Sequence, residues 1–419
     1  MDKIVINGGH RLKGSIKISG AKNAVLPIMA ATLLAAGKFT IRNVPDLRDV
    51  KTMAHLLRII GARVEYADHT LQVDTSNCNF FEAPYELVKT MRASIYVLGP
   101  LVARFSQARV SLPGGCAIGP RPVDLHIKAL EKLGAEIQLL QGYIVAKARK
   151  LRGAHINFDI SSVGATGNTL MAAVLANGVT IIENAALEPD ITALADFLVK
   201  MGAQIEGVGT RQLGIKGVKE LRPVDFEILS DRIETGTFLI AAAITGGEVE
   251  VTSSDVGYIG SLIEKLRESG VHVEEGESTI YCKAPERVKA VSVATAPYPG
   301  FPTDLQAQWM ALMSTADGSS VISDDIFVDR FTHVAELRRL GAQIKLNENV
   351  AMVTGVDRLN GAPVMSTDLR ASASLILAGL RAEGRTEVLR VYHIDRGYEA
   401  IEKKLQSLGA DIWRERGGY

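Results

Sequence analysis

The chain has 419 residues, more than one domain usually contains, so two or more hydrophobic cores are expected. Its 47 Lys and Arg residues balance its 47 Asp and Glu residues, and no long run of one sign is present. This composition excludes the basic character of a nucleic-acid or anionic-membrane binder, so any anion site has to be a local cluster of cations.

The cysteines and the apolar segments indicate a cytoplasmic protein. Cys78, Cys116 and Cys282 are far apart, odd in number and too few for a zinc site or a disulfide framework. The apolar segment 24–36 (AVLPIMAATLLAA) imitates a signal peptide, but it follows a strand-like segment and similar segments recur later, which favours a buried helix. No apolar run reaches the roughly 18 residues that a membrane span needs.

From its start to its end, the chain repeats one unit of about 70 residues six times. Each copy has an apolar helix, a short β-rich run, an amphipathic helix that ends in Gly-Ala or Gly-Val, and an alternating strand. Glycine adopts the left-handed conformation that closes a helix, so the glycine of each pair is predicted to end one. These glycines are Gly61, Gly134, Gly202, Gly270, Gly341 and Gly409.

The apolar helices of the six units predict the fold class. They are expected within residues 23–37, 92–105, 164–178, 232–247, 304–318 and 368–384. Helices this rich in Ala, Leu, Ile and Met, with few charges, are buried on all sides. We therefore predict an inside-out α/β arrangement, with helices inside and sheets outside, in two globules of three units that face each other across a cleft. The boundary is expected in the charged, glycine-rich stretch 207–231.

Polar residues interrupt the start of each apolar helix. They are Lys22, Asn23, Arg92, Thr166, Asn168, Arg232, Glu234, Thr303, Asp304, Asp368 and Arg370. Helix N-capping explains the Thr, Asn and Asp members. It does not explain the cations, because the positive end of a helix disfavours Lys and Arg unless an anion or a carboxylate partner is present.

A second series of cations precedes the amphipathic helices of three units, at Arg121, Arg330 and Arg396. The simpler alternative for these residues is a salt bridge with a neighbouring Asp, such as Asp329 or Asp395. Their recurrence at matching repeat positions favours a shared function. Together the two series predict a substrate with phosphate or carboxylate groups.

Cys116 lies in the glycine-rich loop 112–122 (LPGGCAIGPRP), whose glycines allow the loop to move over a site. A free cysteine is usually a small buried hydrophobe, which we expect for Cys78 and Cys282. A loop offers little core to Cys116, and Arg121 would stabilise its thiolate, so acid/base or nucleophilic chemistry is predicted there. His126 and His393 lie near the basic connections, but no zinc spacing and no nucleotide-binding loop accompanies them, so no metal and no cofactor are expected.

Several segments closely resemble the enolpyruvyl transferase family over the whole chain, and within it the UDP-N-acetylglucosamine 1-carboxyvinyltransferases. They are SGAKNAVLPIMAA, LPGGCAIGPRPVDLH, SVGAT, DRIETGTFL, FPTDLQAQWMAL, TDLRASASL and DRGYE. The shikimate-pathway branch shares the six-unit architecture but lacks the cysteine loop. The resemblance implies a two-domain inside-out α/β barrel, with one domain at 21–229, the other at 1–20 plus 230–419, and the active site between them.

The resemblance also implies an activity and its partners. Such an enzyme transfers the enolpyruvyl group of phosphoenolpyruvate to the 3'-hydroxyl of UDP-N-acetylglucosamine and releases phosphate. This is the first committed step of bacterial peptidoglycan synthesis, on which cell shape and division depend, and the family is the target of fosfomycin. Two small substrates are implied, without an obligate protein partner, nucleic acid or membrane. The alternatives are a transferase like the shikimate-branch enzyme and a non-catalytic UDP-sugar-binding paralogue.

The resemblance further implies a role for each matching residue. Cys116 would protonate phosphoenolpyruvate and form a covalent adduct with it, and Asp304 would take the proton of the sugar hydroxyl. The phosphoenolpyruvate clamp would be Lys22, Asn23, Arg121 and Arg396, with Asp368 and Arg370 lining the site. The UDP-sugar side would be Asn23, Arg92, Arg121, Pro122, Val123, Asp124, Leu125, Ser161, Ser162, Val163, Gly164, Asp304, Ile326 and Arg330. Because Ile160 stands where some members have a lysine, backbone amides or Ser161 and Ser162 would contact the diphosphate.

Overall fold

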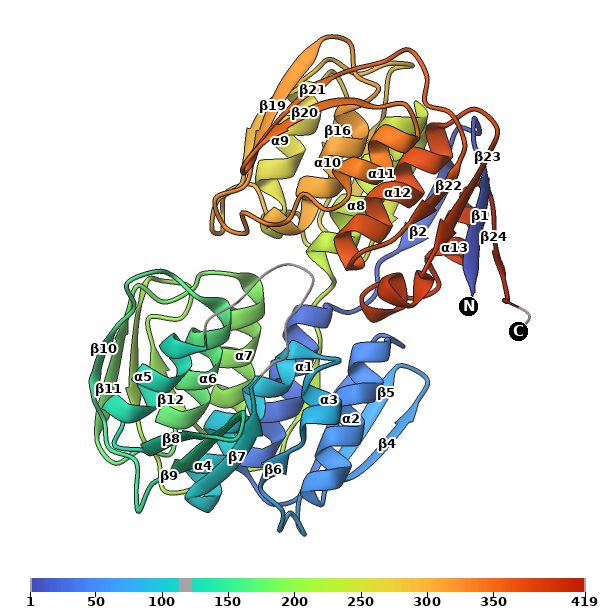
Figure 1. Cartoon of the computed structure of the whole chain (residues 1–419). Helices are drawn as coiled ribbons and strands as arrows, with labels where there is room; N and C mark the ends of the chain where they lie inside the picture. The colour runs from blue at the N-terminus through green and yellow to red at the C-terminus, as the bar shows by residue number, and fades with distance from the viewer. Residues whose placement is uncertain (1, 113–122, 418–419) are drawn as a thin grey trace. The chain divides into compact units, whose positions relative to one another are not determined.

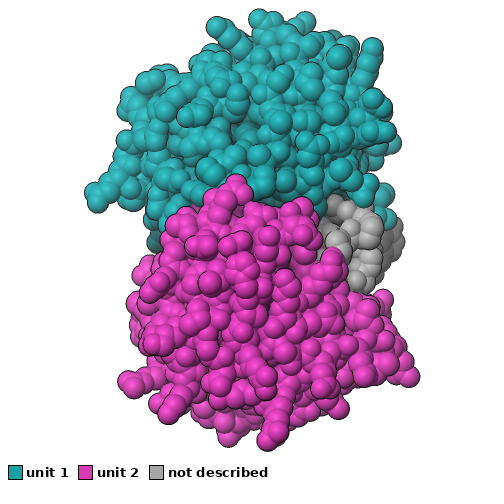
Figure 2. All heavy atoms as spheres, turned by 90° about the vertical axis from the view of Figure 1, so that its left-hand side faces the viewer, with its two compact units in different colours: residues 1–19, 230–419 teal, residues 20–229 magenta. Residues whose placement is uncertain are grey.

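The computed structural model describes residues 2–112 and 123–417 (Figure 1). They belong to two compact units: unit 1 is Met1–Ser19 with Ser230–Tyr419, and unit 2 is Gly20–Leu229 (Figure 2). Cys116, Arg121 and Pro122 of the predicted site lie outside the described residues.

Unit 2 has three four-stranded sheets in its described part. Their strands are β3 (Lys38–Arg42), β4 (Arg63–Ala67), β5 (Thr70–Asp74) and β14 (Asp225–Glu227); β6 (Glu82–Ala83), β7 (Gln107–Ser111), β8 (Glu136–Leu140) and β9 (Tyr143–Lys147); and β10 (His155–Asn157), β11 (Val179–Glu183), β12 (Gln204–Glu206) and β13 (Gln212–Lys216). Its helices are α1 (Lys22–Ala31), α2 (Arg48–Ile60), α3 (Tyr85–Val88), α4 (Leu98–Phe105), α5 (Asp124–Lys132), α6 (Val163–Ala173) and α7 (Pro189–Lys200), with the 3-10 segments η1 (Thr32–Leu34) and η2 (Arg92–Val97).

Unit 1 likewise has three four-stranded sheets among the residues that the structure describes. Their strands are β2 (Lys13–Lys17), β15 (Glu248–Thr252), β16 (His272–Glu275) and β17 (Thr279–Lys283); β18 (Val293–Ala294), β19 (Ser319–Ser323), β20 (Gln343–Asn347) and β21 (Val350–Thr354); and β1 (Lys3–Asn7), β22 (Pro363–Met365), β23 (Arg385–Leu389) and β24 (Asp411–Glu415). Its helices are α8 (Arg232–Thr245), α9 (Gly260–Glu268), α10 (Gln306–Met313), α11 (Val334–Arg339), α12 (Leu369–Arg381) and α13 (Ile401–Ser407), with η3 (Val256–Tyr258), η4 (Thr303–Leu305) and η5 (Val391–Arg396).

Each sheet combines one parallel and two antiparallel strand pairs. In the third sheet of unit 2, β10 precedes α6 in the chain and β11 follows it, and these two strands pair in parallel. β13 then pairs antiparallel with both β11 and β12. Strands from distant parts of the chain complete three of the sheets. β14 joins β3 in unit 2, whereas β2 joins β15 and β1 lies between β23 and β24 in unit 1. The first strands of the chain are therefore an integral part of unit 1.

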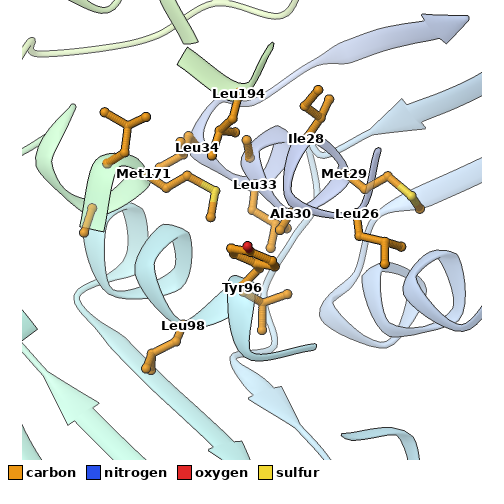
Figure 3. Close-up of a cluster of buried hydrophobic side chains, with 14 of the residues drawn as sticks. Leu26, Ile28, Met29, Ala30, Leu33, Leu34, Tyr96, Leu98, Met171 and Leu194 are labelled. Carbon is orange, nitrogen blue, oxygen red and sulfur yellow. The ribbon is translucent and has the colours of Figure 1, made fainter. Parts of the chain in front are cut away.

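The helical cores confirm the predicted inside-out arrangement. All eight residues of α10 are buried, and so is every residue of α8 and α12 except Arg232 and Arg381. These three helices contact one another. In unit 2, α1, η2, α4 and α6 supply side chains to a similar core, which Figure 3 shows around Tyr96 and Met171. The strands instead alternate buried and exposed residues, so the sheets cover the helices, and none of these sheets closes into a barrel within the described chain.

The six predicted helix-ending glycines all adopt the left-handed conformation. Their φ angles lie between 91° and 108°. At this φ a side chain would be strained, which explains why each helix ends at glycine.

Within residues 2–112 and 123–417, no helix combines the length and the apolar character that crossing a bilayer requires.

Candidate active site

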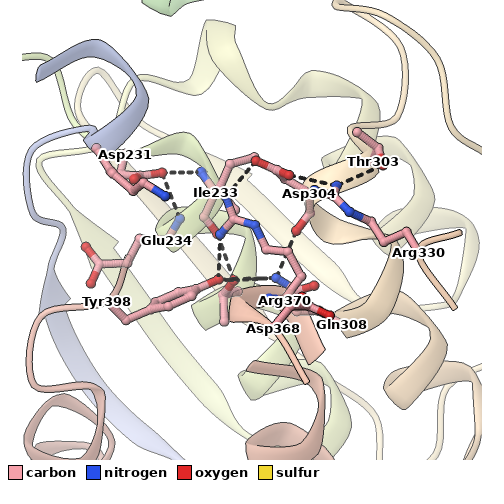
Figure 4. A network of polar contacts seen from close by, with 12 residues as sticks. Asp231, Ile233, Glu234, Thr303, Asp304, Gln308, Arg330, Asp368, Arg370 and Tyr398 are labelled. Carbon is pink, nitrogen blue, oxygen red and sulfur yellow. Dashed lines mark hydrogen bonds and ion pairs between the residues drawn. The ribbon is translucent and has the colours of Figure 1, made fainter. Parts of the chain in front are cut away.

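The carboxylate of Asp304 is the centre of a polar network in unit 1 (Figure 4). Asp304 lies in η4, and its Oδ1 accepts a hydrogen bond from Nη1 of Arg330 at 2.8 Å, while its Oδ2 accepts one from Nη2 of Arg370 at 2.6 Å. The arginine side chains are 7% and 8% exposed, whereas that of Asp304 is 20% exposed. Two buried guanidinium groups therefore hold a carboxylate that a ligand could still reach.

A second layer of this network fixes Arg370. Nη1 of Arg370 lies 3.4 Å from the hydroxyl of Tyr398, which also contacts Thr237 Oγ1 at 2.7 Å and Nε2 of Gln308 at 3.2 Å. Gln308 donates a further bond to the backbone oxygen of Asp304 at 3.0 Å. Burial raises the pKa of Tyr398, so its hydroxyl remains protonated near neutral pH. Arg370 and Asp304 are thus supported by neutral groups from α8, α10 and the segment after η5.

The carboxylate of Asp304 favours the charged form of Arg370. Burial is the largest single influence and lowers the pKa of this guanidinium, but the charge of and hydrogen bond to Asp304, together with Tyr398 and Asp231, outweigh burial and leave the pKa raised. Arg370 is therefore a permanent cation, and its charge stabilises the ionised form of Asp304.

Asp368 acts as the N-cap of α12. Its Oδ1 accepts hydrogen bonds from the backbone N–H groups of Arg370 at 2.8 Å and Ala371 at 3.1 Å, and Thr332 donates to its Oδ2 at 3.1 Å. Burial raises the pKa of Asp368, but these backbone donors and the nearby His333 and Arg330 together outweigh burial, and the pKa is lowered. Asp368 thus positions Arg370, one of the two arginines that hold Asp304.

Lys22 has a carboxylate partner at the start of α1. Its Nζ lies 3.1 Å from Oδ2 of Asp49 on α2, and the two side chains are 14% and 4% exposed. Asn23, the next residue, is partly buried. From the sequence, each cation at a helix start was predicted to face an anion or a partner carboxylate. Lys22 and Arg370 both face a carboxylate, from Asp49 and Asp304.

Arg330 and Asp395 have partners that lie well away from them in the sequence. The partner of Arg330 is Asp304, 26 residues earlier in the chain. Asp395, the alternative partner considered for Arg396, is bound by Arg414 through hydrogen bonds of 2.9 and 2.5 Å. Arg396 itself ends η5 and is partly buried.

In unit 2, the starts of α5 and α6 meet around His126. Ser162 caps α6 by accepting a hydrogen bond from the backbone N–H of Ala165 at 3.3 Å. A Cβ atom at Gly164 would lie 3.1 Å from Nε2 of His126, so glycine permits the close approach of the two helices. Burial and then the charge of Arg92 lower the pKa of His126 to about 4, while Asp124 opposes them. His126 is therefore neutral near pH 7.

This arrangement gathers part of the predicted UDP-sugar set in one place. The structure brings Arg92, Asp124, Ser162 and Gly164 close to His126. Val123, Leu125, Ser161 and Val163 flank them and are partly buried. Ile326 is 37% exposed and lies in unit 1, on the loop that leads to Arg330.

Two polar residues of α6 have a structural explanation instead of the functional one considered for them. Thr166 Oγ1 accepts a hydrogen bond from the backbone N–H of Ala186 at 3.1 Å. Asn168 donates to the backbone oxygen of Ile95 at 2.9 Å and to Nδ1 of His126 at 3.0 Å, and it accepts from the N–H of Gly99 at 2.7 Å. Both side chains are fully buried, so they join α6 to its neighbours.

Sequence reasoning missed several partners of the predicted residues. These partners are Asp49 for Lys22, Gln308 for Asp304 and Tyr398 for Arg370. Gln308 and Tyr398 had a signal, since they lie in the motifs FPTDLQAQWMAL and DRGYE, whereas Asp49 had none. In the part of the chain that the structure describes, no cluster of three His, Cys, Asp or Glu side chains could hold a metal ion.

Within unit 1, a carboxylate held by two guanidinium groups suits a substrate that gives up a proton. Residues 6–405 match the family described as EPSP synthase (3-phosphoshikimate 1-carboxyvinyltransferase). The chain belongs to the EPSP synthase family. It is therefore an enzyme of the enolpyruvyl transferase type, as the resemblance predicted.

Full-length relatives and solved structures agree with the EPSP synthase family. The chain is 58% identical over 418 residues to the UDP-N-acetylglucosamine 1-carboxyvinyltransferase of Chloroherpeton thalassium, covering 99% of this chain and 97% of that protein. It is 58% identical over 419 residues to the protein of that name from Myxococcus xanthus, with 99% and 100% covered. The enolpyruvyl transferase NikO from Streptomyces tendae has a TM-score of 0.90 at 28% identity, with 99% and 98% covered. An EPSP synthase from Acinetobacter baumannii, at 18% identity and a TM-score of 0.76 over 99% and 100% of the two chains, supports the fold alone.

Proposed function

We propose that this enzyme transfers the enolpyruvyl group of phosphoenolpyruvate to the 3'-hydroxyl of UDP-N-acetylglucosamine and releases phosphate, as the first committed step of peptidoglycan synthesis. The observation that carries the proposal is the 56–58% identity, over nearly the whole chain, to relatives named UDP-N-acetylglucosamine 1-carboxyvinyltransferase. The glycine-rich loop around Cys116 supports the same acceptor. The proposal places the enzyme in the cytoplasm and requires no partner beyond its two substrates.

In the first step, we assign the acid to Cys116. Its thiol transfers a proton to the methylene carbon of phosphoenolpyruvate, which leaves an oxocarbenium-like centre at the neighbouring carbon. The two other cysteines are poor alternatives, because burial raises the pKa of Cys78 and raises that of Cys282 to about 12. Lys22, Asn23, Arg121 and Arg396 are assigned to the phosphate and carboxylate of this substrate.

In the second step, Asp304 removes the proton of the sugar hydroxyl, whose oxygen attacks the cationic carbon. Arg330 and Arg370 hold the carboxylate at 2.8 and 2.6 Å, so it is oriented before the substrate arrives. The resulting tetrahedral intermediate then loses phosphate, and the thiolate of Cys116 takes back one proton from the former methylene carbon, which forms the enol ether. The fixed cations stabilise the charge that gathers on the phosphate oxygens.

The acceptor is assigned to the residues around α5 and α6, together with Asp304, Ile326 and Arg330. The free N–H groups at the start of α6 suit a diphosphate, since a helix N-terminus attracts anions. Ile160 is 64% exposed and offers no charge, so Ser161 and Ser162 take this role in the proposal. Residues of both units thus act on the same pair of substrates, and each unit corresponds to one enolpyruvyl transferase domain.

The decisive experiment is a phosphate-release assay with phosphoenolpyruvate and two alternative acceptors. We expect phosphate with UDP-N-acetylglucosamine and none with shikimate 3-phosphate. Release with shikimate 3-phosphate alone would favour the shikimate-branch reaction instead. Binding of UDP-N-acetylglucosamine without phosphate release would identify a non-catalytic sugar-nucleotide sensor.

A further inference from the structure

Ser19 is the residue at which the chain leaves unit 1 for unit 2, and three of its groups are bound by unit 1. Its backbone N–H donates to Oε2 of Glu234 at 2.7 Å, and its carbonyl accepts from the N–H of Asp231 at 2.9 Å. Its hydroxyl accepts from Nζ of Lys404 at 2.8 Å and lies 3.2 Å from Oε2 of Glu399. This residue is therefore restrained far more closely than a linker requires.

The groups that hold Ser19 form a buried ion pair. Lys404 of α13 and Glu234 of α8 are 2.7 Å apart, and their side chains are 17% and 3% exposed. Burial raises the pKa of Glu234, and the charge of Lys404 opposes that effect. A buried pair of this kind costs desolvation energy that apolar residues would not, so stability alone is a weak reason for its presence.

The same helix connects this ion pair with the Asp304 network. Asp231 caps α8 by accepting from the N–H groups of Ile233 at 2.8 Å and Glu234 at 3.1 Å (Figure 4). Thr237, one turn further along α8, contacts the hydroxyl of Tyr398 at 2.7 Å. Two of the residues that bind Ser19, Asp231 and Glu234, therefore belong to the element that supports the tyrosine beside Arg370.

On the other side of Ser19, the chain reaches Lys22 after two residues. A Cβ atom at Gly20 would lie 1.8 Å from the backbone oxygen of Asn43, so the chain passes closely over that residue in unit 2. The N–H of Ala21 then donates to the backbone oxygen of Leu229 at 2.7 Å. Lys22 begins α1 directly afterwards, so Ser19 and the cation are joined by only two residues, both of which contact unit 2.

We propose that Glu234 and Lys404 are positioning residues, which hold Ser19 and thereby set the position of Lys22 for the anionic substrate. The inference rests on the proposed function, in which Lys22 binds phosphoenolpyruvate. It adds that an ion pair whose residues lie far from Lys22 in the sequence controls turnover of phosphoenolpyruvate. The binding of the sugar nucleotide does not depend on this pair.

The test replaces both charges at once, with Glu234→Leu and Lys404→Met, because balanced apolar replacement of a buried pair preserves folding better than removal of one partner. We expect kcat/KM for phosphoenolpyruvate to fall at least tenfold, with a raised KM and a lowered kcat. The dissociation constant for UDP-N-acetylglucosamine should stay within twofold of the original. The matched control is Glu268→Leu with Lys265→Met, an exposed ion pair of 2.7 Å on α9, which should leave every parameter unchanged.

A readout independent of activity accompanies the kinetics. Hydrogen exchange at the amide of Ser19 should become at least tenfold faster in the Glu234/Lys404 double variant, while the amide of Ala21 exchanges at its original rate. This measurement tests the restraint even if the unaltered enzyme shows no turnover with UDP-N-acetylglucosamine, an outcome that would overturn the proposed function alone.

Two results would overturn the inference. One is an unchanged kcat/KM for phosphoenolpyruvate in the double variant. The other is an equal loss of UDP-N-acetylglucosamine binding, which would show a general structural role. If the double variant does not fold, Ser19→Ala replaces it and removes only the hydroxyl contacts. A several-fold loss confined to phosphoenolpyruvate supports the proposal there, and an unaltered rate contradicts it.

Discussion

The buried helices α12 of unit 1 and α6 of unit 2 begin in different chemical surroundings. In unit 1, α12 starts from the Asp368 cap and carries Arg370, which is paired with Asp304 at 2.6 Å. In unit 2, α6 starts from the Ser162 cap and carries Asn168, which is bound to the neutral ring of His126. The start of α12 thus holds a pair of full charges, whereas α6, the corresponding helix of unit 2, is surrounded by neutral dipoles.

This difference teaches how one repeat supports two tasks. Paired charges that are buried before the substrate arrives are already oriented, which suits a carboxylate that has to accept a proton. Neutral donors around a helix start can bind an anionic group without a buried charge of their own. The comparison predicts that changes in the Asp304 network affect rate and stability strongly, and that changes around α6 have smaller effects.

The largest effect is expected from Asp304→Asn. The amide retains the shape of the side chain but cannot accept a proton at neutral pH, so phosphate release should slow roughly a thousandfold. The assay is steady-state turnover with both substrates. Asp357→Asn is the matched control, because Asp357 also pairs with an arginine, at 2.7 Å, but is 93% exposed. A near-normal rate for Asp304→Asn would remove this carboxylate from the mechanism and with it the contrast between the units.

The next effect concerns stability. Arg370→Met leaves Asp304 with one of its two guanidinium partners in a largely buried setting, and breaking such a pair costs about 3 to 5 kcal/mol. The free energy of unfolding in urea measures this loss. Arg358→Met serves as the control, since its pair with Glu383 is more than 60% exposed on both sides and should contribute less than about 1 kcal/mol. Equal losses in the two variants would contradict the claim that the Asp304 network is a special, buried arrangement.

The third effect is a pH dependence of stability that comes from His126 in unit 2. Burial and Arg92 lower the pKa of His126 from 6.5 to about 4, so the unfolded chain binds a proton that the folded protein does not. The stabilising contribution is complete above pH 6.5 and is lost as the pH falls towards 4, by roughly 3 kcal/mol in total. His126→Asn should remove this share of the pH dependence in unfolding titrations.

The controls for this titration lie in unit 1. His333 is also buried with its pKa lowered to about 4, so the His126→Asn protein retains part of the acid sensitivity. His272→Asn is the matched variant at a histidine that is 60% exposed. An unchanged pH profile in His126→Asn would show that the ring is not kept neutral by its surroundings.

Local patterns were sufficient to predict the repeat. Gly61 and its five counterparts end their helices with positive φ, and the apolar segments around α8, α10 and α12 are buried on nearly every side. Both features are encoded in short stretches of sequence, through the conformational freedom of glycine and through composition.

Partners distant in sequence could not be predicted in this way. Arg330 binds Asp304 instead of relying on Asp329, and Asp395 binds Arg414, because the fold brings together segments that no spacing rule connects. The same limit explains why Thr166 and Asn168 looked functional, although their hydrogen bonds join α6 to the neighbouring loop and helices. The position of β1 between β23 and β24 is a further case, since a strand has no local signal for its neighbours.

The smallest effect is expected from Ser162→Ala. Loss of the cap should destabilise the protein by about 1 kcal/mol, and the affinity for UDP-N-acetylglucosamine should fall several-fold if the start of α6 also binds the diphosphate. Asp255→Ala is the matched control, because Asp255 caps η3 in unit 1 and its loss should leave that affinity unchanged. If Ser162→Ala loses stability but keeps its affinity, Ser162 is only a cap. The anion then depends on backbone N–H groups and Arg92, which would make unit 2 an even less charge-dependent site than the comparison implies.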